Sequence, residues 1–336
     1  MKKIFILGAG CWGSTLATVY AEKGFKVTLW EPISENLEYI KLYRKPKFFK
    51  YVKIPPQVHI TSKIEEIKNA DVIFLVTPSI YVNETLSKLE PLKKKLNNKI
   101  LISCVKGFEP TTLKTISTTI YEKLKIEMKQ IFVFSGPSHA EEVAMGKPTA
   151  IVLAGINYKF LKILQKMLST EIIRVYTNDD IIGVEVAGAT KNVYAIAAGI
   201  CDGLNLGNNA KSALLTRSIK EMVLIGKYFG AKITTFFGLA GIGDLLTTAY
   251  SSFSRNRTFG EYLALYKNVN IAKTKIKTSI EGYNTSKVLH IFSEKNKLDL
   301  PIAEEVYKII YKNSSPENAI KNLLSRPLKE EFSWLD

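Results

Sequence analysis

The chain has 336 residues, of which 46% are apolar and 23% charged, a composition that excludes a disordered or fibrous protein and leaves room for two domains. The formal net charge is +16, but the excess is spread along the chain: residues 1–184 carry 27 basic and 17 acidic side chains, and residues 185–336 carry 20 and 14. This even distribution argues against nucleic acid as a partner.

The three cysteines and three histidines show no paired spacing, so we expect neither a disulfide framework nor a metal site. No uncharged apolar run approaches the ~20 residues that span a bilayer, and we expect no integral membrane segment. The basic start of the chain resembles a signal peptide, but it is followed by charged residues and fits a first strand better. We therefore expect a cytoplasmic protein.

Short apolar runs alternate with amphipathic segments through residues 1–184. This pattern predicts an α/β domain with a doubly wound, parallel sheet of the Rossmann type. The predicted strands are Lys3–Leu7, Lys26–Trp30, Val58–Ile60, Val72–Val76, Ile100–Val105, Ile131–Ser135, Ala150–Ala154 and Ile172–Tyr176. The predicted helices between them include Trp12–Lys23, Tyr81–Leu89, Leu113–Lys123 and Phe160–Leu168.

Strand signals fade after residue 180, and helical periodicity takes over. We place a domain boundary near residue 184 and expect an all-α domain over residues 185–336, which would bind the substrate. Its predicted helices are Ile181–Leu204, Lys211–Phe229, Arg255–Tyr266, Thr285–Lys295 and Ala303–Tyr311.

A glycine motif, Gly8-Ala-Gly-Cys-Trp-Gly13, follows the first strand and opens the first helix. Its spacing is that of a dinucleotide fingerprint: Gly8 turns the chain, Gly10 admits the pyrophosphate, and Gly13 allows close packing of helix on strand. The sequence therefore predicts binding of NAD or NADP. A glycine-rich turn without a ligand is the alternative.

Glu31 ends the second strand, 18 positions after Gly13. A carboxylate there would accept a hydrogen bond from an adenosine ribose hydroxyl and repel a 2′-phosphate, which favours NAD over NADP. A surface glutamate at a strand end is the other interpretation.

Two further motifs follow predicted strands at the edge where ligands of open α/β sheets bind. Lys106 comes directly after the fifth strand, and Gly136-Pro-Ser-His-Ala-Glu-Glu142 comes after the sixth. Ser138 and Glu141 also form a capping box, so the second motif is equally explained as the start of a helix.

Lys191 is the only Lys or Arg between Arg174 and Lys211, a 36-residue stretch in which average composition would give roughly five. Its neighbours one helical turn away include Ala187, Gly188 and Ala195, which suit a packed interior. An ammonium held there loses hydration, so its pKa falls and it can exchange a proton near neutral pH. A lysine that extends out of a core helix is the alternative.

The segment from Phe237 to Gly260 supplies a glycine-rich turn ending in Asp244, then Ser254-Arg-Asn-Arg257. Asp244 can orient a lysine or a substrate hydroxyl. Ser254 can cap a helix whose positive end presents Arg255 to a phosphate. A solvated polar turn is the other interpretation.

Taken in order, these motifs resemble the NAD(P)-dependent glycerol-3-phosphate dehydrogenase family, in its bacterial form. The resemblance adds Lys191-Asn-Val-Tyr-Ala-Ile-Ala-Ala-Gly199, Gly241-x-Gly-Asp and Glu281-Gly to the motifs above, and it covers nearly the whole chain. It implies interconversion of sn-glycerol 3-phosphate and dihydroxyacetone phosphate, feeding phospholipid synthesis, and it is compatible with a homodimer.

The resemblance also implies roles for individual residues. Lys191 would be the catalytic proton acceptor or donor. The substrate would be bound by Lys106, Gly136, Ser138, Asn192, Asp244, Thr248, Ser254, Arg255 and Asn256. The cofactor would be bound by Gly8, Gly10, Cys11, Trp12, Gly13, Glu31, Lys106, Ala140, Arg255, Ser279 and Glu281.

Two positions depart from the family pattern. Glu31-Pro32 stands where bacterial members often have a basic residue, and Ser279 stands where a small apolar residue is common. Two other functions stay open from the residues alone: a 3-hydroxy acid dehydrogenase of the same architecture, and an NAD-sensing protein that binds nucleic acid without catalysis.

Overall fold

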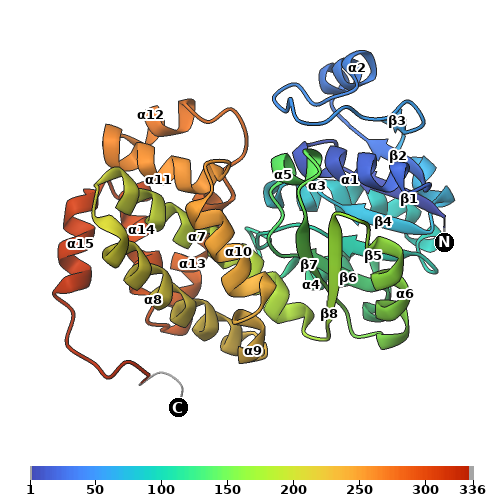
Figure 1. The fold of residues 1–336 in the computed structure, drawn as a ribbon. Helices are drawn as coiled ribbons and strands as arrows, with labels where there is room; N and C mark the ends of the chain where they lie inside the picture. Colours follow the sequence, from blue (N-terminus) through green and yellow to red (C-terminus); the bar gives the residue numbers. More distant parts are fainter. Residues whose placement is uncertain (1, 333–336) are drawn as a thin grey trace.

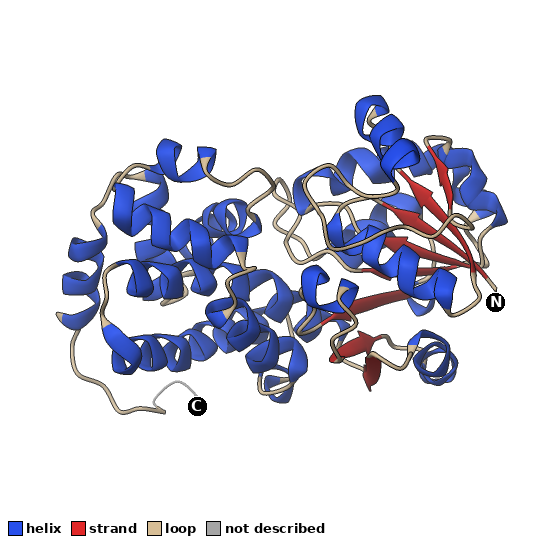
Figure 2. Cartoon of the chain, turned by 45° about the horizontal axis from the view of Figure 1, so that its top comes forward, coloured by secondary structure: helices blue, strands red, loops and turns tan. Residues whose placement is uncertain are grey.

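The computed structural model describes residues 2–332 and consists of a helix-flanked sheet followed by a bundle of helices. In Figure 1 the sheet lies on the right and the bundle on the left, and helix α7 (Ile181–Gly203) enters the bundle directly after the last strand. Figure 2 shows the same division by secondary structure, with every strand on one side of the molecule. This arrangement confirms an α/β domain of Rossmann type followed by an all-α region.

All eight predicted strands are present, with ends that differ from the predicted ones by at most two residues. Their spatial order is β3-β2-β1-β4-β5-β6-β7-β8, which is the doubly wound order with two added strands. The strands are β1 (Lys3–Leu7), β2 (Lys26–Trp30), β3 (His59–Thr61), β4 (Val72–Leu75), β5 (Ile100–Ser103), β6 (Ile131–Ser135), β7 (Thr149–Ala154) and β8 (Ile173–Asn178).

Helices cover both faces of this sheet because successive strand side chains point to opposite sides. Ile4 and Ile6 of β1 belong to a core formed with α1 (Cys11–Glu22) and α6 (Tyr158–Leu168). Phe5 and Leu7 belong to the opposite core, formed with α3 (Val82–Leu89) and α4 (Ile116–Leu124). The sheet half also contains α2 (Ser34–Tyr43), α5 (Ala140–Ala144) and the 3₁₀ segments η1 (Ile64–Asn69), η2 (Ser79–Tyr81), η3 (Glu90–Lys95) and η4 (Met128–Gln130).

One strand pair departs from the predicted parallel arrangement. β7 runs antiparallel to β6, with Phe134 opposite Leu153, while β8 is parallel to β7. A parallel crossover needs a dozen or more residues with a helix that spans the sheet. The link between β6 and β7 contains only the five-residue helix α5, which is too short to cross the sheet. The chain therefore starts β7 at the end of the sheet where β6 stops, and β7 runs in the opposite direction.

The helical part is organised around α7, which is buried along nearly its whole length. None of the helices within residues 2–332 is long and apolar enough to cross a membrane. The other elements of this part are α8 (Gly207–Tyr228), α9 (Ile233–Phe236), η5 (Leu239–Gly243), α10 (Asp244–Tyr250), α11 (Arg255–Tyr266), α12 (Val269–Thr274), α13 (Glu281–Asn296), α14 (Pro301–Tyr311) and α15 (Pro316–Leu324).

Glycines let α11 cross α7 at backbone contact. A Cβ on Gly199 of α7 would lie 1.9 Å from the Arg257 carbonyl oxygen, and a Cβ on Gly260 of α11 would lie 2.0 Å from the Ile196 carbonyl oxygen. Neither position can hold a side chain without moving a helix, so the pair fixes how α11 sits on α7.

The two parts share an apolar contact. Val133 of β6 and Val152 of β7 pack against Ile181 and Val184 of α7 and against Ala240 of η5. The sheet therefore completes one of its faces with residues from the helical part.

Candidate active site

The glycine-rich turn between β1 and α1 has the backbone that a dinucleotide requires. Gly8 has a φ of 113°, a conformation open to glycine, and a Cβ on Gly13 would lie 1.9 Å from the Gly8 carbonyl oxygen. Around Gly10, by contrast, a Cβ would meet nothing within 4 Å. The turn is thus tight where helix and strand meet and open where a pyrophosphate would approach.

Two more features fit a bound dinucleotide. The N-terminus of α1, which begins with Cys11 and Trp12, has no side-chain cap, so its first amides stay available to an anion. Thr77 follows β4 beside the turn, and its buried hydroxyl finds no hydrogen-bond partner among residues 2–332. The residues present therefore fit NAD or NADP, which would bring a nicotinamide ring to this edge of the sheet.

Glu31 and Ala140 lie at the borders of this turn. Glu31 directly follows β2, and its carboxylate accepts a hydrogen bond from the Ile33 amide at 3.1 Å. Burial raises the pKa of this carboxyl above its usual value. Ala140 begins α5, and its carbonyl oxygen accepts from the Thr15 hydroxyl of α1 at 3.4 Å.

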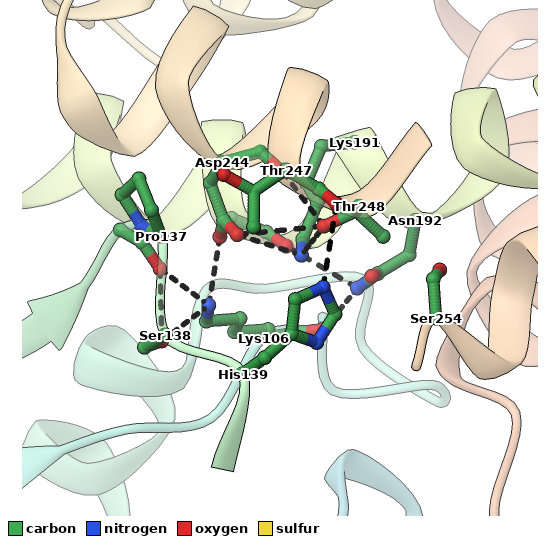
Figure 3. A network of polar contacts seen from close by, with 12 residues as sticks. Lys106, Pro137, Ser138, His139, Lys191, Asn192, Asp244, Thr247, Thr248 and Ser254 are labelled. Atoms are coloured by element: carbon green, nitrogen blue, oxygen red, sulfur yellow. Dashed lines mark hydrogen bonds and ion pairs between the residues drawn. The ribbon is translucent and has the colours of Figure 1, made fainter. Parts of the chain in front are cut away.

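Lys191 lies at the centre of a second cluster, in the middle of α7, with 5% of its surface exposed. Its ammonium donates to Asp244 Oδ1 at 2.9 Å and to the hydroxyl of Thr248, both on α10 (Figure 3). The buried ammonium is therefore paired and aimed by two residues of one neighbouring helix.

Lys106 reaches the same carboxylate from the loop after β5. Its ammonium donates to Asp244 Oδ2 at 2.7 Å, to the Gly136 carbonyl oxygen at 2.9 Å and to Ser138 Oγ at 3.1 Å. Figure 3 shows both ammonium groups on Asp244, each at a different oxygen. One carboxylate thus joins the sheet part to α7.

The charged groups of this cluster shift one another's pKa values. Burial lowers the pKa of Lys191 to about 8, because Lys106 and Arg255 add to the desolvation while Asp244 only partly opposes it. Burial disfavours the ionised Asp244, but the two lysines outweigh it and hold the pKa of its carboxyl below the usual value. Lys191 can therefore be neutral or charged near neutral pH while Asp244 stays ionised.

A chain of amide hydrogen bonds, the amide relay, runs beside this cluster. Asn192 donates to the Lys106 carbonyl oxygen at 3.0 Å, and Asn256 donates to Asn192 Oδ1 at 2.9 Å. The Gly282 amide in turn donates to Asn256 Oδ1 at 2.9 Å. The relay holds α7, α11 and α13 together beside Lys191.

The predicted phosphate segment begins α11. Ser254 is the N-cap of this helix and accepts from the Arg257 amide at 3.2 Å. Arg255 is exposed, and its guanidinium donates to Thr278 Oγ1 at 3.2 Å. Arg257 instead pairs with Asp202 at 2.7 Å, so it braces the helix while Arg255 faces the open side.

Ser279 and Glu281 lie where the segment before α13 meets the sheet part. Ser279 is half-buried two residues ahead of the helix. The Glu281 carboxylate accepts from Ser79 Oγ at 2.6 Å and from the Ser79 amide at 3.2 Å. The structure thus gathers Lys106, Ser138, Lys191 and Thr248 around Asp244, whereas Glu281 contacts Ser79 and Arg255 contacts Thr278.

Besides Thr77, two residues of the site were not singled out by the sequence analysis. His139 precedes α5 and contacts the Thr247 carbonyl oxygen at 3.3 Å (Figure 3), and burial together with the nearby Lys191 lowers its pKa to about 4. Ser79 follows β4. Both lie just past strand ends, at the edge where Lys106 and Gly136 were recognised, so the same rule could have found them. Among residues 2–332, no group of three His, Cys, Asp or Glu side chains is placed to hold a metal ion.

Comparison with known protein families gives two matches. Residues 3–161 match the model of the NAD-dependent glycerol-3-phosphate dehydrogenase N-terminus, and residues 180–321 match that of its C-terminus. The chain is 43% identical over 330 residues to a glycerol-3-phosphate dehydrogenase [NAD(P)+] of Thermotoga sp. (strain RQ2), covering 98% of this chain and 99% of the relative. It is 37% identical to that of Oceanobacillus iheyensis, covering 100% and 97%.

Solved structures agree with these matches. The crystal structure of glycerol-3-phosphate dehydrogenase from Coxiella burnetii superposes with a TM-score of 0.89 at 35% identity, covering 96% of this chain and 99% of that one. The yeast enzyme superposes with a TM-score of 0.81 at 26% identity, with coverage of 96% and 99%.

Proposed function

This chain belongs to the NAD-dependent glycerol-3-phosphate dehydrogenase family, and from that premise we propose that it interconverts sn-glycerol 3-phosphate and dihydroxyacetone phosphate with NAD(P)(H), supplying glycerol 3-phosphate for phospholipid synthesis. The observation that carries this proposal is the buried Lys191 ammonium, paired with Asp244 beside the glycine turn.

Lys191 is the general acid and base in this proposal. In the oxidation, neutral Lys191 Nζ takes the proton from the C2 hydroxyl while the C2 hydride leaves; in the reduction, its ammonium returns a proton to the carbonyl oxygen. A pKa of about 8 allows both forms near neutral pH. Oxidation should therefore gain kcat/KM as pH rises through about 8, and reduction should lose it.

Asp244 and Lys106 support that proton transfer. Asp244 stays ionised between the two lysines and orients Lys191 Nζ through Oδ1. Lys106 is held on Oδ2, and its ammonium is assigned to the C2 oxygen, where negative charge develops during the reaction.

The substrate phosphate is assigned to the start of α11. Arg255 and Asn256 lie in its first turn, behind the Ser254 cap, where the helix dipole and the guanidinium both favour an anion. Asn192 and Thr248 extend the same surface toward Lys191. Gly136 and Ser138 border it from the sheet part, where both contact Lys106.

The cofactor is assigned to the turn at Gly8, Gly10 and Gly13, with Cys11 and Trp12 at its helix. A bound nicotinamide would supply the hydride acceptor or donor. NAD(H) is favoured over NADP(H), because the Glu31 carboxylate follows β2 at the edge of this turn and would repel a 2′-phosphate. Ala140, Ser279 and Glu281 are assigned to the remaining cofactor contacts.

We further propose that the protein is cytoplasmic, that it forms a homodimer, and that its two domains meet near residue 184. Buried free Cys104 and Cys201 suit a reducing compartment.

The first experiment follows NADH absorbance with dihydroxyacetone phosphate, with NADPH assayed in parallel. We expect turnover with NADH and a lower kcat/KM with NADPH. Turnover of a 3-hydroxy acid instead would favour the other dehydrogenase. Filter binding of nucleic acid without any turnover would favour the NAD-sensing protein.

A further inference from the structure

Ser79 links the sheet part to the helical part next to the loop that carries Lys106. It is 3% exposed and begins η2, just past the carboxyl end of β4. Its hydroxyl and its amide both donate to the carboxylate of Glu281, the first residue of α13, at 2.6 and 3.2 Å. A hydroxyl and an amide of one part therefore hold both oxygens of a carboxylate of the other.

The space around this pair is full. A Cβ placed on Gly107, in the loop that carries Lys106, would lie 2.5 Å from Ser79 Cβ and 3.1 Å from Glu281 Oε2. The loops after β4 and β5 and the start of α13 therefore meet with no room for another side chain, so Glu281 cannot shift without moving its neighbours.

The pair continues directly into the amide relay of the active site. Gly282, the next residue of α13, donates its amide to Asn256, which donates to Asn192, which donates to the Lys106 carbonyl oxygen. The chain of contacts thus leaves the sheet part at Ser79 and returns to it at Lys106, passing through three helices of the bundle.

A second carboxylate–serine pair also links the two parts. Glu185, on the first turns of α7, accepts from the amide of Ser117 at 2.8 Å and from its hydroxyl. Glu185 is 3% exposed and lies close to the point where the chain passes from β8 to α7. The Glu185 pair lies near the covalent connection between the two parts, whereas Ser79 and Glu281 are 202 positions apart in the sequence.

We propose that Ser79 is a positioning residue that, through Glu281, sets the start of α13 and with it Gly282, Asn256 and Asn192 in the geometry that binds the substrate. This inference rests on the proposed function, because it takes Asn256 and Asn192 as substrate contacts. Loss of the Ser79 hydroxyl leaves the Glu281 carboxylate with one donor instead of two. Burial already disfavours the ionised carboxylate and raises its pKa, so Glu281 would turn toward water and displace α13.

The test compares Ser79→Ala with Ser87→Ala, a control on α3 whose hydroxyl donates to the Asn83 carbonyl oxygen. We expect Ser79→Ala to raise the KM for dihydroxyacetone phosphate about tenfold, while kcat stays within about twofold, since loss of a hydrogen bond to a charged group has roughly this effect. Ser87→Ala should match wild type. An unchanged KM in an active, folded Ser79→Ala enzyme would overturn the inference.

A double-mutant cycle tests whether the effect passes through the relay. In a protein that already carries Asn256→Ala, and so lacks the relay, adding Ser79→Ala should raise the KM by less than about twofold. The reason is that the effects of substitutions within one hydrogen-bond network do not add. A full tenfold effect in both backgrounds would show that Ser79 acts elsewhere.

A readout without turnover separates this inference from the proposed function. Hydrogen exchange of the Gly282 amide should be about tenfold faster in Ser79→Ala than in wild type, even if no substrate is turned over. Equal exchange rates would overturn the inference. Should Ser79→Ala fail to fold, Ser79→Cys, which keeps a side chain of similar shape but donates a weaker hydrogen bond, takes its place in the same measurements with the same expected directions.

Discussion

The glycine-rich turn and the Asp244 cluster are built by different means. The turn lies within six consecutive residues, Gly8–Gly13, and its shape comes from the backbone: a positive φ at one glycine, no room for a Cβ at another and open space at a third. The cluster gathers charged side chains from the β5 loop, α7 and α10. One site depends on local conformation, the other on contacts between residues far apart in the sequence.

This difference predicts how each site fails. A side chain added to the turn should block ligand approach or packing and leave the distant charges in place. Loss of one charge from the cluster should change the protonation of its partners, because a buried ion that loses its counter-ion becomes costly. The following changes test that separation.

Lys191→Ala should have the largest effect. Without the proton acceptor, kcat should fall by ~10²–10⁴, while NADH binds almost as before, because the glycine turn is untouched. Steady-state rates and a titration of NADH by protein fluorescence measure the two effects. Exposed Lys295→Ala is the matched control. A variant that keeps more than about a tenth of wild-type turnover would falsify the assigned role.

Arg255→Ala should act on substrate binding. The guanidinium is exposed at the start of α11, and the loss of a charge-assisted anchor should raise the KM for the phosphate ester by about 10–100-fold with a smaller change in kcat. Kinetics with dihydroxyacetone phosphate measure this change. If KM stays the same, Arg255 does not hold the phosphate.

Gly13→Ala should act on the turn alone. Its Cβ would lie 1.9 Å from the Gly8 carbonyl oxygen, so the strand and helix must separate, at a cost of about 1–3 kcal/mol. We expect a lower Tm and weaker NADH binding, measured by thermal unfolding and by titration. Gly10→Ala, which meets no protein atom within 4 Å, is the control for folding. Equal stability of both variants would contradict the account of the turn.

Glu185→Gln should have the smallest effect, visible only in the pH dependence of stability. Burial raises the pKa of Glu185 to about 7, above its value in the unfolded chain. The folded protein therefore holds this proton longer, and stability falls as pH rises from about 4.5 through about 7. Glu185→Gln cannot ionise and should not show this decline, which amounts to roughly 2–3 kcal/mol between pH 5 and pH 8; the Tm of both proteins at the two pH values measures it. Parallel curves for the two proteins would argue against a buried, neutral Glu185.

Much of the sheet part could be predicted because its signals are local. Each strand is a short apolar run, and the glycine spacing stands directly after β1. Helix α2 was not predicted, since it has only two buried residues. A helix start was predicted at Ser138–Glu141, but α5 is five residues long, too short for periodicity to show its extent. The antiparallel β7 also escaped prediction, because strand direction depends on how the chain crosses the sheet.

The Asp244 cluster could be predicted only in part. The absence of any other Lys or Arg from residues 175–210 and the small neighbours of Lys191 indicated that it is buried, and the motifs pointed to Lys106 and Asp244. The link of Ser79 to Glu281 could not be predicted, because 202 positions separate them and neither has a local signature of pairing. Such contacts depend on how the sheet part and the helical part pack against each other.

The apolar contact of β6 and β7 with Ala240 has a consequence for biosynthesis. On the ribosome, the strand that ends at Ala154 emerges well before Ala240. At ~5–20 residues per second, the interval lasts roughly 4–17 seconds. Ile181 and Val184 emerge early in this interval, but the apolar face of the sheet stays incompletely covered until Ala240 arrives, so a chaperone that shields it would raise the yield of active enzyme.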